Sequence, residues 1–208
     1  MRLLSLDMST RRTGWAFFND GKLEAYNLIE ADDKNVYDRM SNTYFAIQEL
    51  VSSYDIEYIV CEDVPVALHS NLQTGKDLCV LQGCIVILCY LNKLGFHLAK
   101  PTIWRCWIGL NRSLYRCKIC GHEKEDISGK NFTICSVCGN KDKKQLEKNA
   151  LNDREHLKRR AVEMANDVFG LDLEYISKNS KNNDDDIAEA ILIGYSFLKE
   201  TDDNGRKD

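Results

Sequence analysis

The hydrophobic pattern of the chain predicts strands near its start and helices toward its end. Apolar runs at 2–6, 14–18 and 22–29 predict three strands, and the Asp-Gly step at 20–21 favours a tight hairpin between the second and third. Two further strands are expected at 57–61 and 96–100. The first of these two ends at Glu62, just as the opening strand ends at Asp7.

Helical spacing of apolar residues predicts the remaining elements. Helices are expected at 36–53, at 74–94, and as a short segment at 104–110. Two more follow at 153–169, with Asn152 or Asp153 as the N-cap, and at about 184–199, before a charged tail at 201–208. This order predicts an α/β protein with a mixed five-stranded sheet flanked by helices.

The most apolar stretch is Leu78–Leu91, which is 14 residues long and contains Gln82 and Gly83. A run of this length is too short to span a bilayer and favours a buried helix. The N-terminus reaches the charge at Asp7 after only a few leucines, so we expect no signal peptide.

Nine cysteines fall into two groups. Four of them form two CxxC pairs, each followed by glycine, and fourteen residues separate the pairs: Cys117, Cys120, Cys135 and Cys138. This spacing predicts a structural zinc ribbon inserted at 113–145, between the two parts of the main domain at 1–112 and 146–200. The alternatives are two redox-active pairs, or His122 as a ligand.

The other five cysteines lie in apolar surroundings, where a free thiol behaves as a small hydrophobic group. They are Cys61, Cys79, Cys84, Cys89 and Cys106. Their odd total and irregular spacing give no disulfide framework, so we expect a reducing, cytoplasmic setting.

Charge is strongly segregated along the chain. The 208 residues carry a formal charge of −4, but residues 100–160 hold 15 Lys and Arg against 7 Asp and Glu. This stretch therefore carries +8, which is typical of a nucleic-acid contact surface, with Tyr115 and Phe132 as possible stacking residues. The alternatives are a solvated basic insert and a ribbon that binds another protein.

Carboxylates occupy three places where a buried centre could use them. Asp7 and Glu62 each follow a predicted strand, and Asp186 and Glu189 lie three apart on one face of the last helix. Gathered carboxylates repel one another unless cations neutralise them, and Mg²⁺ prefers oxygen ligands. The set therefore favours two-metal hydrolysis of a phosphodiester. Taken singly, each residue could be a turn, an exposed strand end or a helix N-terminus.

Three motifs together resemble the RuvC-type Holliday-junction resolvases. Asp7–Ala16 (DMSTRRTGWA) resembles the family's opening motif, and Ile59–Val64 (IVCEDV) resembles the strand that ends on a catalytic Glu. Asp186–Ile191 (DIAEAI) resembles the last motif, an acidic pair followed by Ala. The segment from Pro101 to Arg105, with Lys158 further on, resembles the part that presents a basic residue to the phosphate.

The resemblance implies an RNase H-like fold and a homodimer that cuts branched DNA in a Mg²⁺- or Mn²⁺-dependent reaction. It makes Asp7, Glu62, Asp186 and Glu189 the metal ligands and Lys158 the residue that stabilises charge on the phosphate, with Asp185 as a rival for Asp186. This chain departs from the family pattern at two positions. Glu189 stands at a position where Asp or His is common in the family. Pro65 stands near the position where some members have an aromatic residue that stacks on junction bases.

Two other classes of protein are compatible with parts of the sequence. Actin-like kinases also open with an Asp and a Thr-Gly hairpin, but 208 residues leave no room for their second domain. A non-catalytic zinc-ribbon adaptor would make the carboxylates dispensable. A nuclease acting on RNA, flaps or forks would use the same sheet and metal site.

Overall fold

The computed structural model describes residues 1–64, 72–127, 133–150, 153–178 and 180–204. Its main body is a five-stranded sheet in the order β3-β2-β1-β4-β5. Its strands are β1 (Arg2–Asp7), β2 (Arg12–Asn19), β3 (Lys22–Glu30), β4 (Tyr58–Glu62) and β5 (Gly95–Ala99). The first three strands pair antiparallel, whereas β4 pairs parallel with β1 and β5. The predicted mixed sheet is therefore confirmed.

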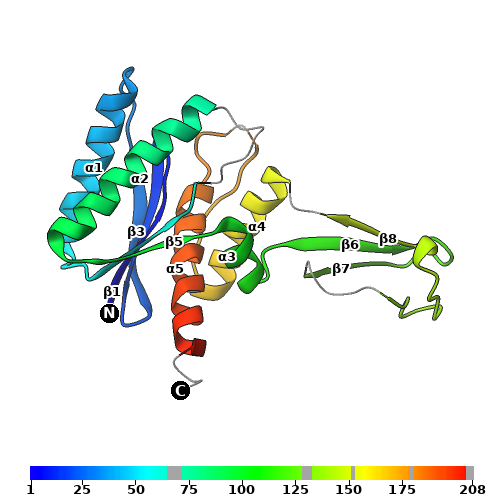
Figure 1. Ribbon diagram of the computed structural model, residues 1–208. Helices are drawn as coiled ribbons and strands as arrows, with labels where there is room; N and C mark the ends of the chain where they lie inside the picture. Colours follow the sequence, from blue (N-terminus) through cyan, green and yellow to red (C-terminus); the bar gives the residue numbers. More distant parts are fainter. Residues whose placement is uncertain (65–71, 128–132, 151–152, 179, 205–208) are drawn as a thin grey trace.

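Helices cover both faces of this sheet (Figure 1). One face packs against α1 (Val36–Ser53) and α2 (Leu72–Asn92), and the other packs against α4 (Arg154–Phe169) and α5 (Asp185–Asn204). Strand alternation divides β1 between the two cores: Leu4 and Leu6 face α1 and α2, whereas Leu3 faces α4 and α5. The result is a three-layer α/β/α body with the sheet buried in the middle.

Small residues let α5 lie directly on β1 and β2. A Cβ at Gly14 would stand 1.9 Å from the carbonyl oxygen of Asp186, and a Cβ at Gly194 would stand 2.4 Å from the ring of Phe18. The hydroxyl of Ser5 donates a hydrogen bond of 2.7 Å to the carbonyl oxygen of Ala190. These contacts hold the first half of α5 closely on β1 and β2.

Local signals explain where the elements begin and end. Asp20 and Gly21 have positive φ angles of 46° and 80°, as a type I′ hairpin turn requires, so the predicted hairpin is confirmed. Asp153 is the N-cap of α4. The short helix α3 spans Pro101–Trp107, earlier than the expected 104–110, because proline is well suited to the first position of a helix.

A second sheet leaves the body as an arm (Figure 1). Its strands are β6 (Arg112–Cys117), β7 (Glu123–Ile127) and β8 (Leu146–Ala150), in the antiparallel order β7-β6-β8, with the 3-10 turn η1 (Lys143–Gln145) before β8. The sequence pattern did not reveal these three strands. They connect α3 to the segment before α4 and carry the four cysteines of the CxxC pairs at the far end of the arm.

Helix α2 is longer than the apolar run seen in the sequence, at 21 residues. By length and composition alone it could cross a membrane. Its inward side chains Leu81, Ile85 and Leu88 are buried in the protein core, whereas Ile87 and Tyr90 face outward and are exposed. The helix that is long and apolar enough to cross a membrane therefore packs on the sheet along one side.

Candidate metal centres

The sheet topology brings the predicted carboxylates together. Strands β1 and β4 are adjacent and parallel, and Leu6 pairs with Cys61. Asp7 and Glu62 are the next residues on the two strands, so they lie side by side at the same end of the sheet. Helix α5 begins over this edge, and its first turns supply Asp186 and Glu189. Helix α4 contributes Lys158 from the same side. All five residues expected from the sequence thus lie in one cluster, which we call the carboxylate cluster.

Asp7 lies at the centre of the carboxylate cluster. Burial raises its pKa well above the usual range, and the nearby carboxylates of Glu189, Glu62 and Asp186 raise the pKa further. Within the described residues, the Asp7 carboxylate has no hydrogen bond or ion pair with another side chain. A partly buried carboxylate without a side-chain partner is costly and favours a bound cation.

Arg105 of α3 joins two of the other carboxylates. Its Nη2 lies 3.0 Å from Glu62 Oε1 and 3.0 Å from Glu189 Oε1. The indole N–H of Trp104 donates a further hydrogen bond of 3.0 Å to the same oxygen of Glu62. Burial raises the pKa of Glu189 to about 7 although Arg105 opposes the shift, and burial also raises the pKa of Glu62.

Lys158 holds the two aspartates at the start of α5. Its ammonium binds the carboxylate of Asp185 and lies 3.1 Å from Asp186 Oδ1. Burial alone would lower the Lys158 pKa, but these carboxylates raise it to about 12. Asp185 is 5% exposed, whereas the Asp186 side chain is 20% exposed and reaches Arg12 Nε at 3.6 Å. Asp186 is thus the more accessible of the two rival ligands.

Arg12 of β2 fixes the loop that leads into α5. Its guanidinium donates hydrogen bonds to the carbonyl oxygens of Lys181 and Asn183. The buried amide of Asn183 accepts from the backbone N–H of Ile176 and donates to the carbonyl of Ser177. The start of α5 is therefore held from both sides, which preorganises Asp186 over the end of the sheet.

The carboxylate cluster suits a hard divalent cation. It offers only oxygen ligands, the type that Mg²⁺ and Mn²⁺ prefer. When ionised, the four predicted ligands and Asp185 bring five negative charges, and Arg12, Arg105 and Lys158 bring three positive ones. Two negative charges remain. Within the described part of the chain, however, these carboxylates do not converge within 4.8 Å as the ligands of a compact site do.

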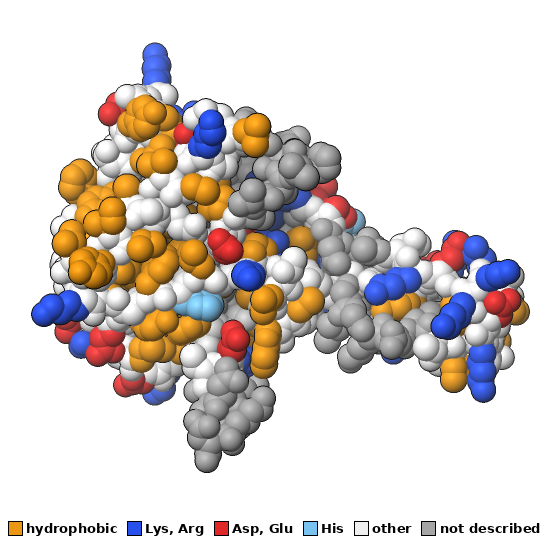
Figure 2. All heavy atoms as spheres, viewed as in Figure 1, with side chains coloured by type: hydrophobic (Ala, Val, Ile, Leu, Met, Phe, Trp, Pro, Cys, Tyr) orange, Lys and Arg blue, Asp and Glu red, His pale blue; other side chains and the backbone are white. Residues whose placement is uncertain are grey.

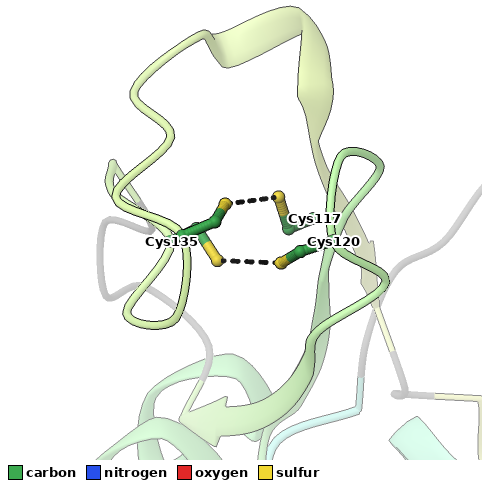
Figure 3. A group of neighbouring side chains, drawn as sticks. Cys117, Cys120 and Cys135 are labelled. Atoms are coloured by element: carbon green, nitrogen blue, oxygen red, sulfur yellow. Dashed lines mark hydrogen bonds between the residues drawn. The ribbon is translucent and has the colours of Figure 1, made fainter.

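The four cysteines do converge in this way. Their sulfur atoms all lie within 4.8 Å of one another, and Figure 3 shows the two pairs pointing toward each other across the tip of the arm. The Sγ atoms of Cys117 and Cys138 are 3.6 Å apart, as are those of Cys120 and Cys135. Four thiolates around one Zn²⁺ stand roughly 3.8 Å apart, so the cluster fits a tetrahedral zinc ion.

The two CxxC turns repeat one backbone pattern. The N–H groups of Gly121 and Gly139 donate to the carbonyl oxygens of Cys117 and Cys135, and both glycines have a positive φ near 70°. Backbone N–H groups also point at the first sulfur of each turn. The N–H of Cys120 lowers the pKa of Cys117 to about 6, and the N–H of Cys138 lowers the pKa of Cys135. The first cysteine of each turn thus favours the thiolate, the form that binds zinc, whereas the pKa values of Cys120 and Cys138 are raised.

The structure bears on several of the other residues that the sequence singled out. Tyr115, a possible stacking residue, is only 2% exposed and lies under Lys148, so it is not available for stacking on bases. Phe132 and Pro65 lie outside the described residues. The sequence indicated neither Trp104 nor Arg12 as part of the cluster, and Arg105 only through the resemblance, because their contacts come from distant segments. All nine cysteines are free thiols in the structure.

The sheet and its helices form an RNase H-like fold similar to that of RuvC. The structure is similar to that of Thermus thermophilus RuvC in complex with a Holliday junction substrate, with a TM-score of 0.58 and 9% identity. A second Thermus thermophilus RuvC structure gives a TM-score of 0.52 and 11% identity. Both comparisons cover 95% of this chain and 93% of the other. The sequence matches no protein-family model and no curated protein.

Proposed function

We propose that this protein is a structure-selective endonuclease that hydrolyses phosphodiester bonds in branched DNA. The observation that carries the proposal is the gathering of Asp7, Glu62, Asp186 and Glu189 at one edge of a RuvC-like sheet. The fold agrees with that of a protein whose structure was solved with a four-way junction. The substrate class is taken from that neighbour and from the motif resemblance.

The four carboxylates would hold Mg²⁺ or Mn²⁺, in a two-metal arrangement. When bound, such ions activate a water molecule and stabilise charge on the phosphate and the leaving oxygen. The chain's own residues have separate tasks. Trp104 orients Glu62, Arg12 holds the segment that carries Asp186, and Lys158 places a positive charge beside the cluster, where a phosphate oxygen would be stabilised.

We assign the zinc ribbon to DNA contact rather than to catalysis. Four thiolates close the coordination sphere of zinc, so no position remains for a water molecule or a phosphate. Lys141, Lys143 and Lys144 are exposed next to the cysteine cluster and are suited to neutralise phosphates. The arm would therefore extend the contact surface beyond the body of the protein.

A homodimer would let two carboxylate clusters meet two strands of one junction. The outward face of α2 is suited to such a contact, because it is apolar and no residue from 78 to 92 is charged. Figure 2 shows hydrophobic side chains gathered over the α1 and α2 side of the molecule. The exposed ones on the two helices are Tyr37, Phe45, Leu72, Val80, Val86, Ile87, Tyr90 and Leu91.

The decisive test is a cleavage assay with a labelled four-way junction, a flap, a duplex, a single strand and an RNA junction, each with Mg²⁺ or Mn²⁺. We expect nicks placed symmetrically in the DNA junction and little cutting of the duplex. Asp7→Asn and Glu62→Gln should lower the cleavage rate by at least about a hundredfold, because each removes a metal ligand. Asp185→Asn and Asp186→Asn compared side by side identify the third ligand.

Asp172→Asn is the matched control, because Asp172 is an exposed carboxylate outside the cluster. It should cut like the unaltered protein. Binding of the junction without any cleavage under either metal would exclude the enzyme and leave a zinc-ribbon adaptor. Preferential cutting of the flap or the RNA junction would change the proposed substrate but would still support the proposed nuclease activity.

A further inference from the structure

Arg105 occupies an unusual position inside the carboxylate cluster. One nitrogen atom, Nη2, lies 3.0 Å from an oxygen of Glu62 and 3.0 Å from an oxygen of Glu189. These two carboxylates come from β4 and α5, which are distant in the sequence, and the guanidinium is the group that links them. A positive charge therefore bridges two of the four predicted metal ligands.

A divalent ion and this guanidinium cannot both occupy the bridge. An ion bound to the same two oxygens would lie about 2.1 Å from each, in the space that Nη2 fills. Arginine does not lose its proton in proteins, so it cannot make room by becoming neutral. Their mutual repulsion in a partly buried site would be strong, and the side chain must move when an ion enters.

The side chain has both a reason and a path to move. Its Nε is buried without a hydrogen-bond partner among the described atoms, and such an unsatisfied donor destabilises the present arrangement. The side chain is nevertheless 20% exposed, so one end of it already reaches solvent. It stands at the last turn of the short helix α3, and no ion pair other than those with Glu62 and Glu189 holds it within the described residues.

We propose that Arg105 is a built-in counter-ion that competes with the divalent metal for Glu62 and Glu189. In the metal-free protein it holds the two carboxylates in place and limits their repulsion. Metal binding displaces it toward solvent, so part of the binding energy of the ion is used to break this bridge. The inference rests on the proposed function, because it takes the carboxylate cluster as the metal site.

The test measures Mn²⁺ binding without DNA, by the electron paramagnetic resonance signal of free Mn²⁺ at pH 8. The protein is loaded with zinc before the titration. Because thiolates prefer zinc to Mn²⁺, the ribbon then takes up no Mn²⁺ and the signal reports on the carboxylates. Arg105→Gln should bind Mn²⁺ on the order of tenfold more tightly, because the competing charge is gone. Arg105→Lys keeps the charge and should stay close to the unaltered protein.

Arg159→Gln is the matched control, since Arg159 is an exposed arginine of α4 whose ion pair is with Glu163. It removes the same charge without touching the cluster and should leave the affinity unchanged. A second readout is thermal melting: Mn²⁺ should raise the melting temperature of Arg105→Gln more than that of the unaltered protein. This comparison holds even if the metal-free variant is less stable.

The outcomes separate the two proposals. Equal or weaker Mn²⁺ binding by Arg105→Gln overturns the counter-ion role and leaves the nuclease proposal standing. No Mn²⁺ binding by any of these proteins overturns the metal site itself, and both proposals fall. Tighter binding that persists when Glu62→Gln is added would place the ion elsewhere and also overturn the inference.

Discussion

At the scale of single residues, burial and nearby charge decide the state of the carboxylate cluster. Glu189 is only 6% exposed, and burial outweighs the attraction of Arg105 in setting its pKa. Glu62, Asp186 and Asp7 are shifted in the same direction, and burial is the largest cause for each. The metal-free cluster is therefore a destabilising feature that a cation would relieve.

This arrangement predicts a pH dependence of stability. Because the Glu189 pKa is about 7 when folded and near 4.5 when unfolded, the folded protein binds more protons between these values. The free energy of unfolding must then fall as pH rises through this window and level off above it. We expect the zinc-loaded, Mg²⁺-free protein to melt roughly 5 °C lower at pH 8 than at pH 5.

Circular dichroism melts from pH 5 to 8 provide the measurement. Glu189→Gln should show a flatter profile, because the substituted side chain does not titrate. Glu163→Gln, an exposed position on α4, should keep the slope of the unaltered protein. A melting temperature that rises steadily toward pH 8 in the unaltered protein would contradict the explanation.

At the scale of elements, the same helix can serve the core and an interface. The inward side of α2 packs against α1 and β5, with Ile85, Leu88 and Cys89 in the core, while its outward side stays apolar. Monomeric proteins seldom expose large contiguous apolar patches, and α1 and α2 together carry eight exposed large apolar side chains among the described residues. Burial of this face in a dimer would remove it from water.

The dimer is tested by a charge placed on the outward face of α2. Ile87 is 58% exposed, so Ile87→Glu should leave the fold intact and weaken dimerisation by at least about tenfold, since a buried carboxylate is costly. Sedimentation velocity gives the association state. Val168→Glu, an exposed apolar position on α4, is the control and should sediment like the unaltered protein. A monomer at all concentrations before mutation would remove the dimer from the proposal.

At the scale of the whole molecule, the charge segregation along the sequence corresponds to the division between the body and the arm. The basic stretch 100–160 includes the complete arm, whereas the rest of the chain carries −12. The acidic body and the basic arm can therefore have different tasks, with the arm attracting phosphates. The overall charge of −4 conceals this division.

Salt dependence of junction binding tests the arm. Changing Lys141, Lys143 and Lys144 together to Gln should reduce the slope of log affinity against log salt by about 3, close to one unit for each lost phosphate contact. A matched triple change of Lys22, Lys34 and Lys93, exposed lysines of the body, should alter the slope little. An unchanged slope in the first variant would favour a protein partner for the ribbon.

The sequence alone predicted most of the framework, because those features depend on local periodicity and spacing. The five strands of the main sheet, the two CxxC pairs and the order of Asp7, Glu62, Asp186 and Glu189 could all be read from it. The arm strands β6, β7 and β8 were missed, since they are short and polar and lack a clear alternation. The sequence pattern places the start of α3 three residues too late, because the proline at 101 directly follows a strand and resembles its end.

Only the tertiary structure decided how these residues meet. Gly14 brings the start of α5 onto β2, Asn183 and Arg12 hold the preceding loop, and Arg105 reaches Glu62 and Glu189 from another helix. Such contacts join positions that are far apart in the sequence. The hydrogen bond from Arg12 to Asn183, for example, joins positions 171 residues apart. The sequence determined which side chains were available, whereas packing determined their neighbours, because burial and charge depend on residues that local patterns do not include.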